Sequence, residues 1–128
     1  MEFRRTYSGA PWEETVGYCR AVQAGNTIYV TGTAPVDAEG EVVGPGDGYA
    51  QAVRCIELIR QALEDLDSGL DQVVRTRILV TDIDRWEAYG RAHREAFGDH
   101  PPATTLVEVS RLIHPDMLVE MEAVAVTG

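Results

Sequence analysis

The sequence predicts an α+β fold, in which one mixed β-sheet carries two helices on one of its faces. Alternating, β-branched runs occur in the first and the last thirds of the chain, and two segments between them have helical apolar spacing. Each helical segment follows strands and leads into another strand, an order that suits helices packed on one side of a sheet. The predicted order is β-β-β-α-β-α-β-β in a single domain, 1–128, because a chain of this length builds one core and not two.

The first third of the chain is predicted to form three strands. Glu2–Ser8 is the first of them, and Trp12–Val16 is expected to be a loop. Tyr18–Val22 and Thr27–Thr31 both alternate, and they flank a tight turn at Ala24-Gly25-Asn26. Two β-rich runs joined by such a turn are typical of a hairpin.

Two helices and a strand are predicted in the middle of the chain. Tyr49–Leu66 repeats apolar residues at spacings of three and four, and so does the second helix, Arg85–Phe97. The strand Val73–Thr81 lies between them. One of its faces is expected to carry Val74, Thr76, Ile78 and Val80. The buried stripe of the second helix is expected to consist of Trp86, Tyr89, His93 and Phe97.

The last third begins with His100–Leu112, which opens with two prolines and continues as a β-branched run. Prolines end the preceding helix, so a strand is predicted here. A final strand, Met117–Val126, follows a turn. One face of this sheet carries Val, Leu and Met side chains that two helices cannot cover, so we expect an oligomer.

Composition excludes several classes of function. The formal net charge is −10, from 21 acidic and 11 basic residues. This charge opposes binding to nucleic acid or to an anionic membrane surface. The sequence shows no membrane-spanning run and no signal-peptide core, so a cytoplasmic protein is expected. Cys19 and Cys55 have neither disulfide nor zinc spacing and are expected to be buried free thiols.

No phosphate-binding loop or hydrolase motif is present. His93, His100 and His114 lie far apart in the sequence and have no carboxylate or thiol spacing beside them. We therefore expect no metal site. His93 lies on the apolar stripe of the second helix, where a hydrogen-bonded core histidine is the expected role.

Candidate chemistry lies on the last strand, where Glu120 and Glu122 share one face. This face is either solvent-exposed with no further role, or it presents a carboxylate with a raised pKa that accepts a proton from water or donates one to a leaving amine. Tyr18 and Arg20 likewise share a face of the second strand. Tyr18 either packs in the sheet or uses its hydroxyl to bind a small-molecule ligand.

Eight blocks of sequence carry a family resemblance that covers nearly the whole chain. They are Gly17–Val22, Gly25–Val36, Ala50-Gln51, Asp71–Thr76, Val80–Asp82, Phe97–Ala103, Val107–Leu112 and Leu118–Ala123. In this order and spacing the chain resembles the YjgF/RidA (Rid) family, also called the L-PSP endoribonuclease family.

The resemblance implies a chorismate-mutase-like fold and a homotrimer with clefts between its subunits. In the deaminating members, a small 2-imino or 2-enamino acid reacts with water to give a 2-oxo acid and ammonia, without metal or cofactor. By this resemblance Tyr18 and Glu120 are catalytic residues that handle water and protons. Gly32 seats the ligand with its backbone, and Trp86 is an aromatic cleft residue.

Thr104 is the departure from the family pattern, because active members have a carboxylate-gripping arginine after the Pro-Ala pair. Loss of this charged donor should weaken carboxylate binding by about 1.5–3 kcal/mol. Arg20 is a candidate replacement, and a surface or interface salt bridge is its alternative role. Three functions stay open: a divergent imine or enamine hydrolase, a non-catalytic ligand-binding or regulatory trimer, and an endoribonuclease, which the acidic charge disfavours.

Overall fold

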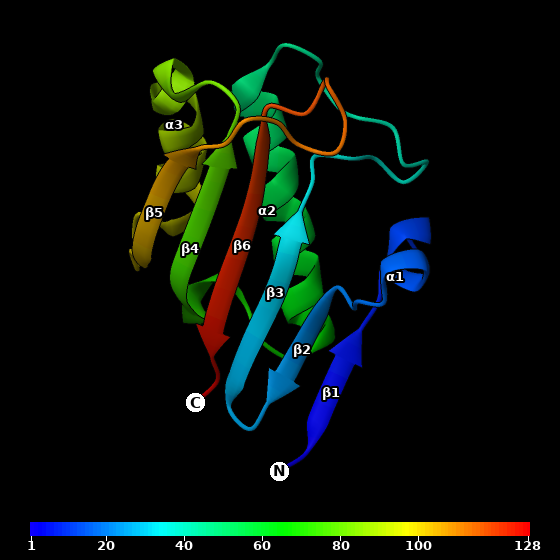
Figure 1. The fold of residues 1–128 in the computed structure, drawn as a ribbon. Coiled ribbons are helices and arrows are strands. Elements are labelled where there is room, and N and C mark those ends of the chain that lie inside the picture. The colour runs from blue at the N-terminus through cyan, green and yellow to red at the C-terminus, as the bar shows by residue number, and fades with distance from the viewer.

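The computed structural model describes residues 1–128 as one six-stranded mixed sheet with two long helices on one face (Figure 1). Along the sheet the strands are β1 (Phe3–Thr6), β2 (Ala21–Ala24), β3 (Thr27–Thr33), β6 (Val119–Val126), β4 (Val73–Val80) and β5 (Ala103–Glu108). Only β4 and β5 run parallel, and the other neighbours are antiparallel. The predicted α+β architecture is confirmed.

The core lies between the sheet and the helices α2 (Gly48–Asp65) and α3 (Trp86–Phe97). Side chains of β6 alternate between buried and partly exposed, so every second residue faces the helices. The buried positions are Val119, Met121, Ala123 and Ala125. The face of the sheet turned away from the helices has no cover within one chain (Figure 1).

A short helix, α1 (Pro11–Val16), lies where a loop was predicted. Pro11 at its first position and acidic residues in its first turn favour a helix start, which the sequence interpretation overlooked. Gly17, with φ at 90°, ends the helix, and the Tyr18 amide still donates to the Glu13 carbonyl at 2.9 Å. The first strand of the hairpin therefore begins at Ala21, whereas the sequence predicted that it begins at Tyr18.

Two predictions about side-chain placement are wrong: that Val74 shares a face with Thr76, Ile78 and Val80, and that Trp86 is buried. Val74 is 49% exposed, because the β4–β6 register shifts between Val73 and Arg75 and turns this side chain outward. Trp86 is 54% exposed at the first residue of α3, whereas Tyr89 and Phe97 of the same predicted stripe are buried.

Short 3₁₀ segments precede β4 and α3, at Leu70–Gln72 and Ile83–Arg85. The fifth strand ends at Glu108, earlier than predicted, and a loop leads from there to β6. None of the helices combines the length and the apolar character that a bilayer crossing requires.

Candidate functional site

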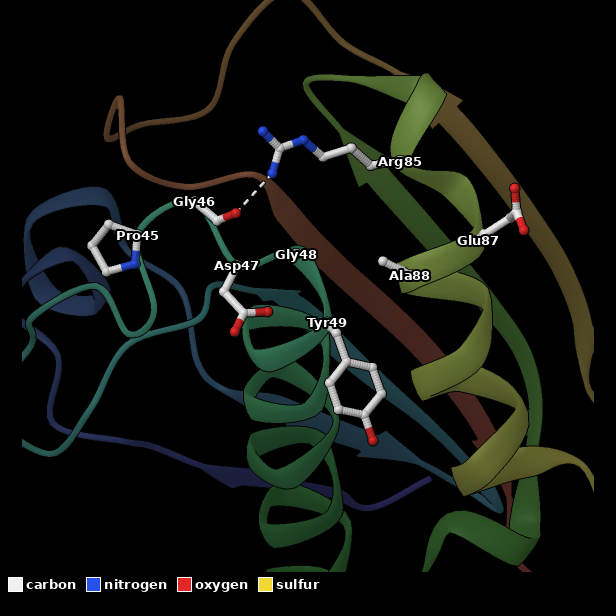
Figure 2. A pocket seen from close by; sticks show the side chains of 8 residues that line it. All are labelled: Pro45, Gly46, Asp47, Gly48, Tyr49, Arg85, Glu87 and Ala88. Atoms are coloured by element: carbon white, nitrogen blue, oxygen red, sulfur yellow. Dashed lines mark hydrogen bonds between the residues drawn. The ribbon is translucent and has the colours of Figure 1, made fainter.

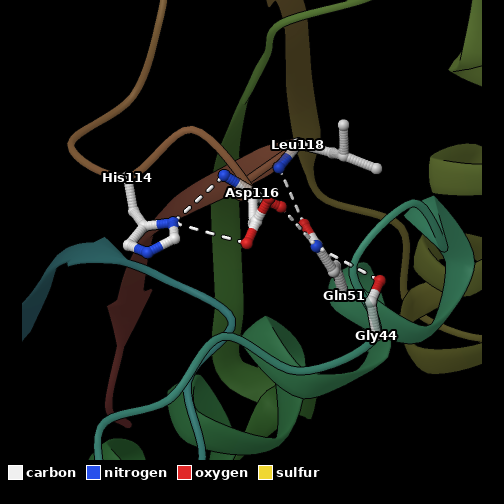
Figure 3. A network of polar contacts seen from close by, with 5 residues as sticks. All are labelled: Gly44, Gln51, His114, Asp116 and Leu118. Atoms are coloured by element: carbon white, nitrogen blue, oxygen red, sulfur yellow. Dashed lines mark hydrogen bonds and ion pairs between the residues drawn. The ribbon is translucent and has the colours of Figure 1, made fainter.

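The start of β6 is held by a buried glutamine from α2 (Figure 3). Gln51 is fully buried, and its Nε2 donates to the carbonyl oxygens of Asp116, at 2.8 Å, and Gly44, at 3.3 Å. Its Oε1 accepts from the Leu118 amide at 2.7 Å. These three bonds fix the backbone two residues before Glu120, so α2 sets the position of the candidate carboxylate.

Glu120 lies on the sheet face turned away from α2 and α3, where it contacts Gly32 of β3. A Cβ atom added to Gly32 would lie only 2.8 Å from Oε2 of Glu120. The β3–β6 register is irregular between Val30 and Thr33, next to this contact. A glycine at position 32 therefore lets the carboxyl group lie directly against the backbone of the neighbouring strand.

Arg20, which directly precedes β2, holds the Gly32 backbone from the other side. Its Nη2 donates to the Gly32 carbonyl oxygen at 2.7 Å, whereas its Nε is buried without a partner. Burial lowers the pKa of the Arg20 guanidinium, and the nearby carboxylates of Glu13 and Glu120 oppose this shift. The guanidinium thus adds a positive charge beside the carboxyl group and holds the backbone against which that group lies.

Burial raises the pKa of the Glu120 carboxyl above its ordinary value, and the negative charge of Glu122 adds to the shift. The Arg20 charge opposes the shift without cancelling it. A carboxylate with a raised pKa binds a proton more tightly than a free one does, so Glu120 is suited to accept a proton from water.

Tyr18 lines a hollow of about 570 Å³ beside α1, together with Cys19 and Tyr29. Glu13, which the sequence interpretation missed, is buried below this hollow and accepts hydrogen bonds from the amides of Ser8 and Gly9 at 3.1 and 3.3 Å. It ties α1 to the preceding segment and so positions Tyr18. The helix-start signal at Pro11 could have identified this residue.

Thr104 lies apart from Glu120 within one chain, because its side chain points toward the helix-covered side of the sheet. Its Oγ1 is 2.7 Å from Oγ1 of Thr76 and 3.4 Å from Nε2 of His93. Thr76 Oγ1 is itself 2.8 Å from the same histidine nitrogen. The expectation that His93 is hydrogen-bonded is confirmed, whereas its side chain is only half-buried and lies outside the hydrophobic core.

A second hollow, of about 590 Å³, lies between the N-terminal ends of α2 and α3 (Figure 2). Arg85 crosses this hollow and donates to the Gly46 carbonyl oxygen at 2.8 Å. Its lining residues are Pro45, Gly46, Asp47, Gly48, Tyr49, Arg85, Glu87 and Ala88. None of the candidate site residues lines it, so its size alone does not make it the functional site.

Comparison with known proteins places this geometry in a family. A family model described as Endoribonuclease L-PSP matches residues 10–127. A crystal structure from Mycobacterium tuberculosis, of a YjgF/YER057c/UK114 family member, superposes with a TM-score of 0.91 at 41% identity, covering 98% of this chain and 100% of that one. The chain belongs to the YjgF/RidA (L-PSP) family.

Other YjgF/RidA relatives agree over most of the chain. A RutC family protein of Pyrococcus abyssi is 40% identical over 109 residues, covering 84% of each protein. The 3-aminoacrylate deaminase RutC of Acinetobacter baylyi is 33% identical over 108 residues, covering 84% of this chain and 85% of that protein. The Escherichia coli YjgF structure has a TM-score of 0.81 at 28% identity, covering 95% of this chain and 93% of that one.

The YjgF/RidA fold thus brings some of the predicted site residues together and separates others. Arg20, Gly32 and Glu120 form one contact group. Tyr18 precedes Arg20 by two residues in the chain and lies near enough for its hydroxyl to oppose the lowering of the Arg20 pKa by burial. Trp86 and Thr104 lie on α3 and β5, away from this group within one chain. Burial strongly raises the pKa of the Cys55 thiol, as predicted for a buried free cysteine, whereas Cys19 is only half-buried.

Proposed function

We propose that this YjgF/RidA chain hydrolyses a small imine or enamine, releasing ammonium and leaving a carbonyl compound. The observation that carries the proposal is the half-buried Glu120 carboxyl, whose pKa is raised and which lies against Gly32. Water is a poor nucleophile until a base accepts one of its protons, and a carboxylate of raised pKa suits this role.

In the proposed reaction, Glu120 accepts a proton from the water that attacks the imine carbon. The same carboxyl gives this proton to the nitrogen, which forms a carbinolamine. It then accepts the proton of the carbinolamine hydroxyl and passes it to the nitrogen, so that the carbonyl forms, the carbon–nitrogen bond breaks and ammonia leaves. Tyr18 donates its hydroxyl to the ligand or the water, and Gly32 lines the site with backbone. Arg20 keeps that backbone in place and favours an anionic group nearby through its charge.

We also propose a homotrimer with ligand clefts between its subunits. The sheet face that carries Glu120 is uncovered, and it also exposes Tyr29 and Val107, which are 52% and 40% accessible. Apolar side chains on an open sheet face favour burial against another copy. A cleft between this open face and the exposed edge of a neighbouring subunit, where β5 is the edge strand and α3 lies beside it, would bring Thr104 and Trp86 of that neighbour nearer to Glu120. Native mass spectrometry tests the assembly, for which three copies are expected and a monomer would contradict it.

The name of the Acinetobacter baylyi relative, 3-aminoacrylate deaminase, supports deamination as the kind of reaction. The test uses 2-aminoacrylate, generated enzymatically in solution, which tautomerises to 2-iminopropanoate and yields pyruvate and ammonium. We expect the wild type to release ammonium above the uncatalysed rate and Glu120→Gln to lose about 10²-fold or more of that gain. No gain in the wild type would contradict the proposal.

Glu122→Gln is the matched control, because Glu122 lies on the same face of β6 and pairs with Arg77 at 3.4 Å. It removes one negative charge from the same strand without touching the Gly32 contact. We expect this variant to retain the wild-type rate within about threefold, since an exposed ion pair contributes little. Equal losses in Glu120→Gln and Glu122→Gln would indicate a general charge effect and not proton transfer.

The second candidate is a trimer that binds a small ligand without turnover. Thr104 favours this alternative, because its hydroxyl is engaged with Thr76 where the active members carry a carboxylate-binding arginine. Titration calorimetry with 2-oxobutanoate, combined with absent ammonium release, would support it. RNA cleavage is not proposed, because a net charge of −10 opposes an RNA backbone.

A further inference from the structure

A chain of polar side chains runs from the exposed edge of the sheet into the layer beneath α3. It begins at Thr104 of β5, which is exposed, passes through Thr76 of β4, which is fully buried, and ends at His93 of α3. Thr76 and Thr104 are register partners in the parallel β4–β5 ladder. The oxygen–oxygen distance of 2.7 Å and the oxygen–nitrogen distance of 2.8 Å are those of hydrogen bonds.

This chain of hydrogen bonds is electrically neutral. Burial lowers the pKa of the His93 imidazole and so favours its uncharged form. The imidazole also packs against the Phe97 ring, with 4.6 Å between the two ring centroids. The cation of the adjacent register position, Arg77, points to the opposite face of the sheet and pairs with Glu122. An incoming group at Thr104 therefore meets hydroxyl groups backed by a neutral imidazole, with no positive charge among them.

A neutral imidazole gives the chain two directions. With the proton on Nδ1, Nε2 accepts from Thr76, Thr76 accepts from Thr104, and the Thr104 oxygen offers lone pairs outward. With the proton on Nε2, each bond reverses, and the Thr104 hydroxyl is free to donate to a ligand or to the Pro102 carbonyl oxygen, 3.3 Å away. The histidine tautomer thus determines whether Thr104 acts as a donor or an acceptor.

We propose that Thr104, Thr76 and His93 form a specificity element that binds an uncharged polar group, such as a carboxamide, in preference to a carboxylate. The proposal deepens the proposed function, on which it rests for the reaction: the substrate class becomes a small imine or enamine that carries a neutral amide or carbonyl. The Thr104 hydroxyl can both donate and accept a hydrogen bond, and an amide has both an N–H donor and a carbonyl acceptor to match it. A carboxylate bound at the same place would have no positive charge to pair with its negative charge.

The probes that test this inference are pyruvamide and pyruvate, which differ only in the amide and the carboxylate. Their binding to the nitrogen-15-labelled wild type is measured by NMR, with the His93 ring nitrogens as reporters of the tautomer. We expect pyruvamide to bind at least about tenfold more tightly than pyruvate, which corresponds to about 1.4 kcal/mol, and to shift the His93 nitrogens. Pyruvate binding as tightly as pyruvamide would overturn the inference.

Three substitutions separate binding from folding. Thr104→Val removes the hydroxyl at nearly constant volume and should abolish the tenfold preference, whereas Thr104→Ser retains the hydroxyl and should keep it. Thr76→Val removes the hydroxyl that links Thr104 to His93 and leaves only the direct contact of 3.4 Å between Thr104 Oγ1 and His93 Nε2, so pyruvamide should shift the His93 ring nitrogens less than in the wild type. Wild-type preference in Thr104→Val would overturn the proposal. If Thr76→Val unfolds the protein, the comparison of Thr104→Val with Thr104→Ser still tests whether the hydroxyl sets the preference for pyruvamide.

Glu120→Gln distinguishes this inference from the proposed function. That variant should lose imine turnover and keep the pyruvamide preference, because Glu120 is not part of the hydroxyl–imidazole chain. A wild type that hydrolyses neither 2-iminopropanoate nor its carboxamide, and that still prefers pyruvamide through Thr104, would contradict only the reaction. A wild type that turns over 2-iminopropanoate but shows no pyruvamide preference would contradict only the specificity element.

Discussion

Replacing Gly32 by alanine tests whether the position of the Glu120 carboxyl matters. The added Cβ would lie 2.8 Å from Oε2, 3.2 Å from Cδ and 3.7 Å from Cγ of Glu120. Non-bonded atoms prefer separations of about 3.5–4.0 Å, so the carboxyl end must retreat by roughly 1 Å. The backbone itself accepts alanine, because Gly32 is not among the glycines with a positive φ.

The expected effect falls on activity and not on stability. A misplacement of about 1 Å in a catalytic group can cost about 10²-fold in rate. The free energy of unfolding should change by less than about 1 kcal/mol, since only the flexible end of one partly exposed side chain moves. The hydrogen bond from Arg20 to the Gly32 carbonyl oxygen does not involve the new methyl group and should persist.

The assay compares kcat/KM for 2-iminopropanoate hydrolysis and the thermal midpoint of Gly32→Ala with those of the wild type. Gly90→Ala is the matched control, because a Cβ at Gly90 would have no neighbour within 4 Å. This control should keep full activity and gain up to about 1 kcal/mol, as expected for alanine in a helix. If Gly32→Ala kept the wild-type kcat/KM, the position of the Glu120 carboxyl group against Gly32 would not matter for catalysis, and the reasoning would be refuted.

Three further predictions follow from the same contacts. Gln51→Leu leaves the Leu118 amide and two carbonyl groups unpaired, so urea titration should show a loss of about 2–4 kcal/mol, against less than about 0.5 kcal/mol for the exposed Gln61→Leu on the same helix. The pKa of Glu120 is higher in the folded state than in the unfolded state, so between these two pKa values the folded protein binds more protons than the unfolded protein does. The free energy of unfolding therefore falls as the pH rises through that window. Glu120→Gln should therefore raise the thermal midpoint at pH 7 and lose this advantage below the unfolded pKa of about 4.3; an advantage that persists or grows in acid would contradict the sign. Thr104→Arg supplies a charged, bidentate donor and should lower KM for 2-iminopropanoate by about 10- to 100-fold, whereas an unchanged KM would show that this position does not meet the carboxylate.

Sequence patterns were sufficient for the parts of the fold where local and tertiary preferences agree. Helical periodicity gave α2 and α3 within one or two residues, and alternation identified β3, β4 and β6. Failures occurred where a short-range signal was weak. The helix α1 has only six residues and no amphipathic repeat, and Val74 is displaced by a register shift that depends on β6, a strand distant in sequence.

The candidate site was predictable in its chemistry and less so in its contacts. The spacing of Glu120 and Glu122 indicated a shared face, and the alternating burial along β6 supports it. The Gly32 contact and the Arg20 bond join strands from different parts of the chain, so no local pattern could show them. The hydroxyl cluster at Thr104 likewise depends on the parallel pairing of β4 with β5.

The most direct test of the central claim is the position of a bound product. Crystals of the wild type soaked with 2-oxobutanoate should show the molecule beside Glu120 and the Gly32 backbone, in a cleft closed by a neighbouring subunit. Density only in the hollow between the N-terminal ends of α2 and α3, or a Glu120 carboxyl that makes no contact with the ligand, would contradict the account.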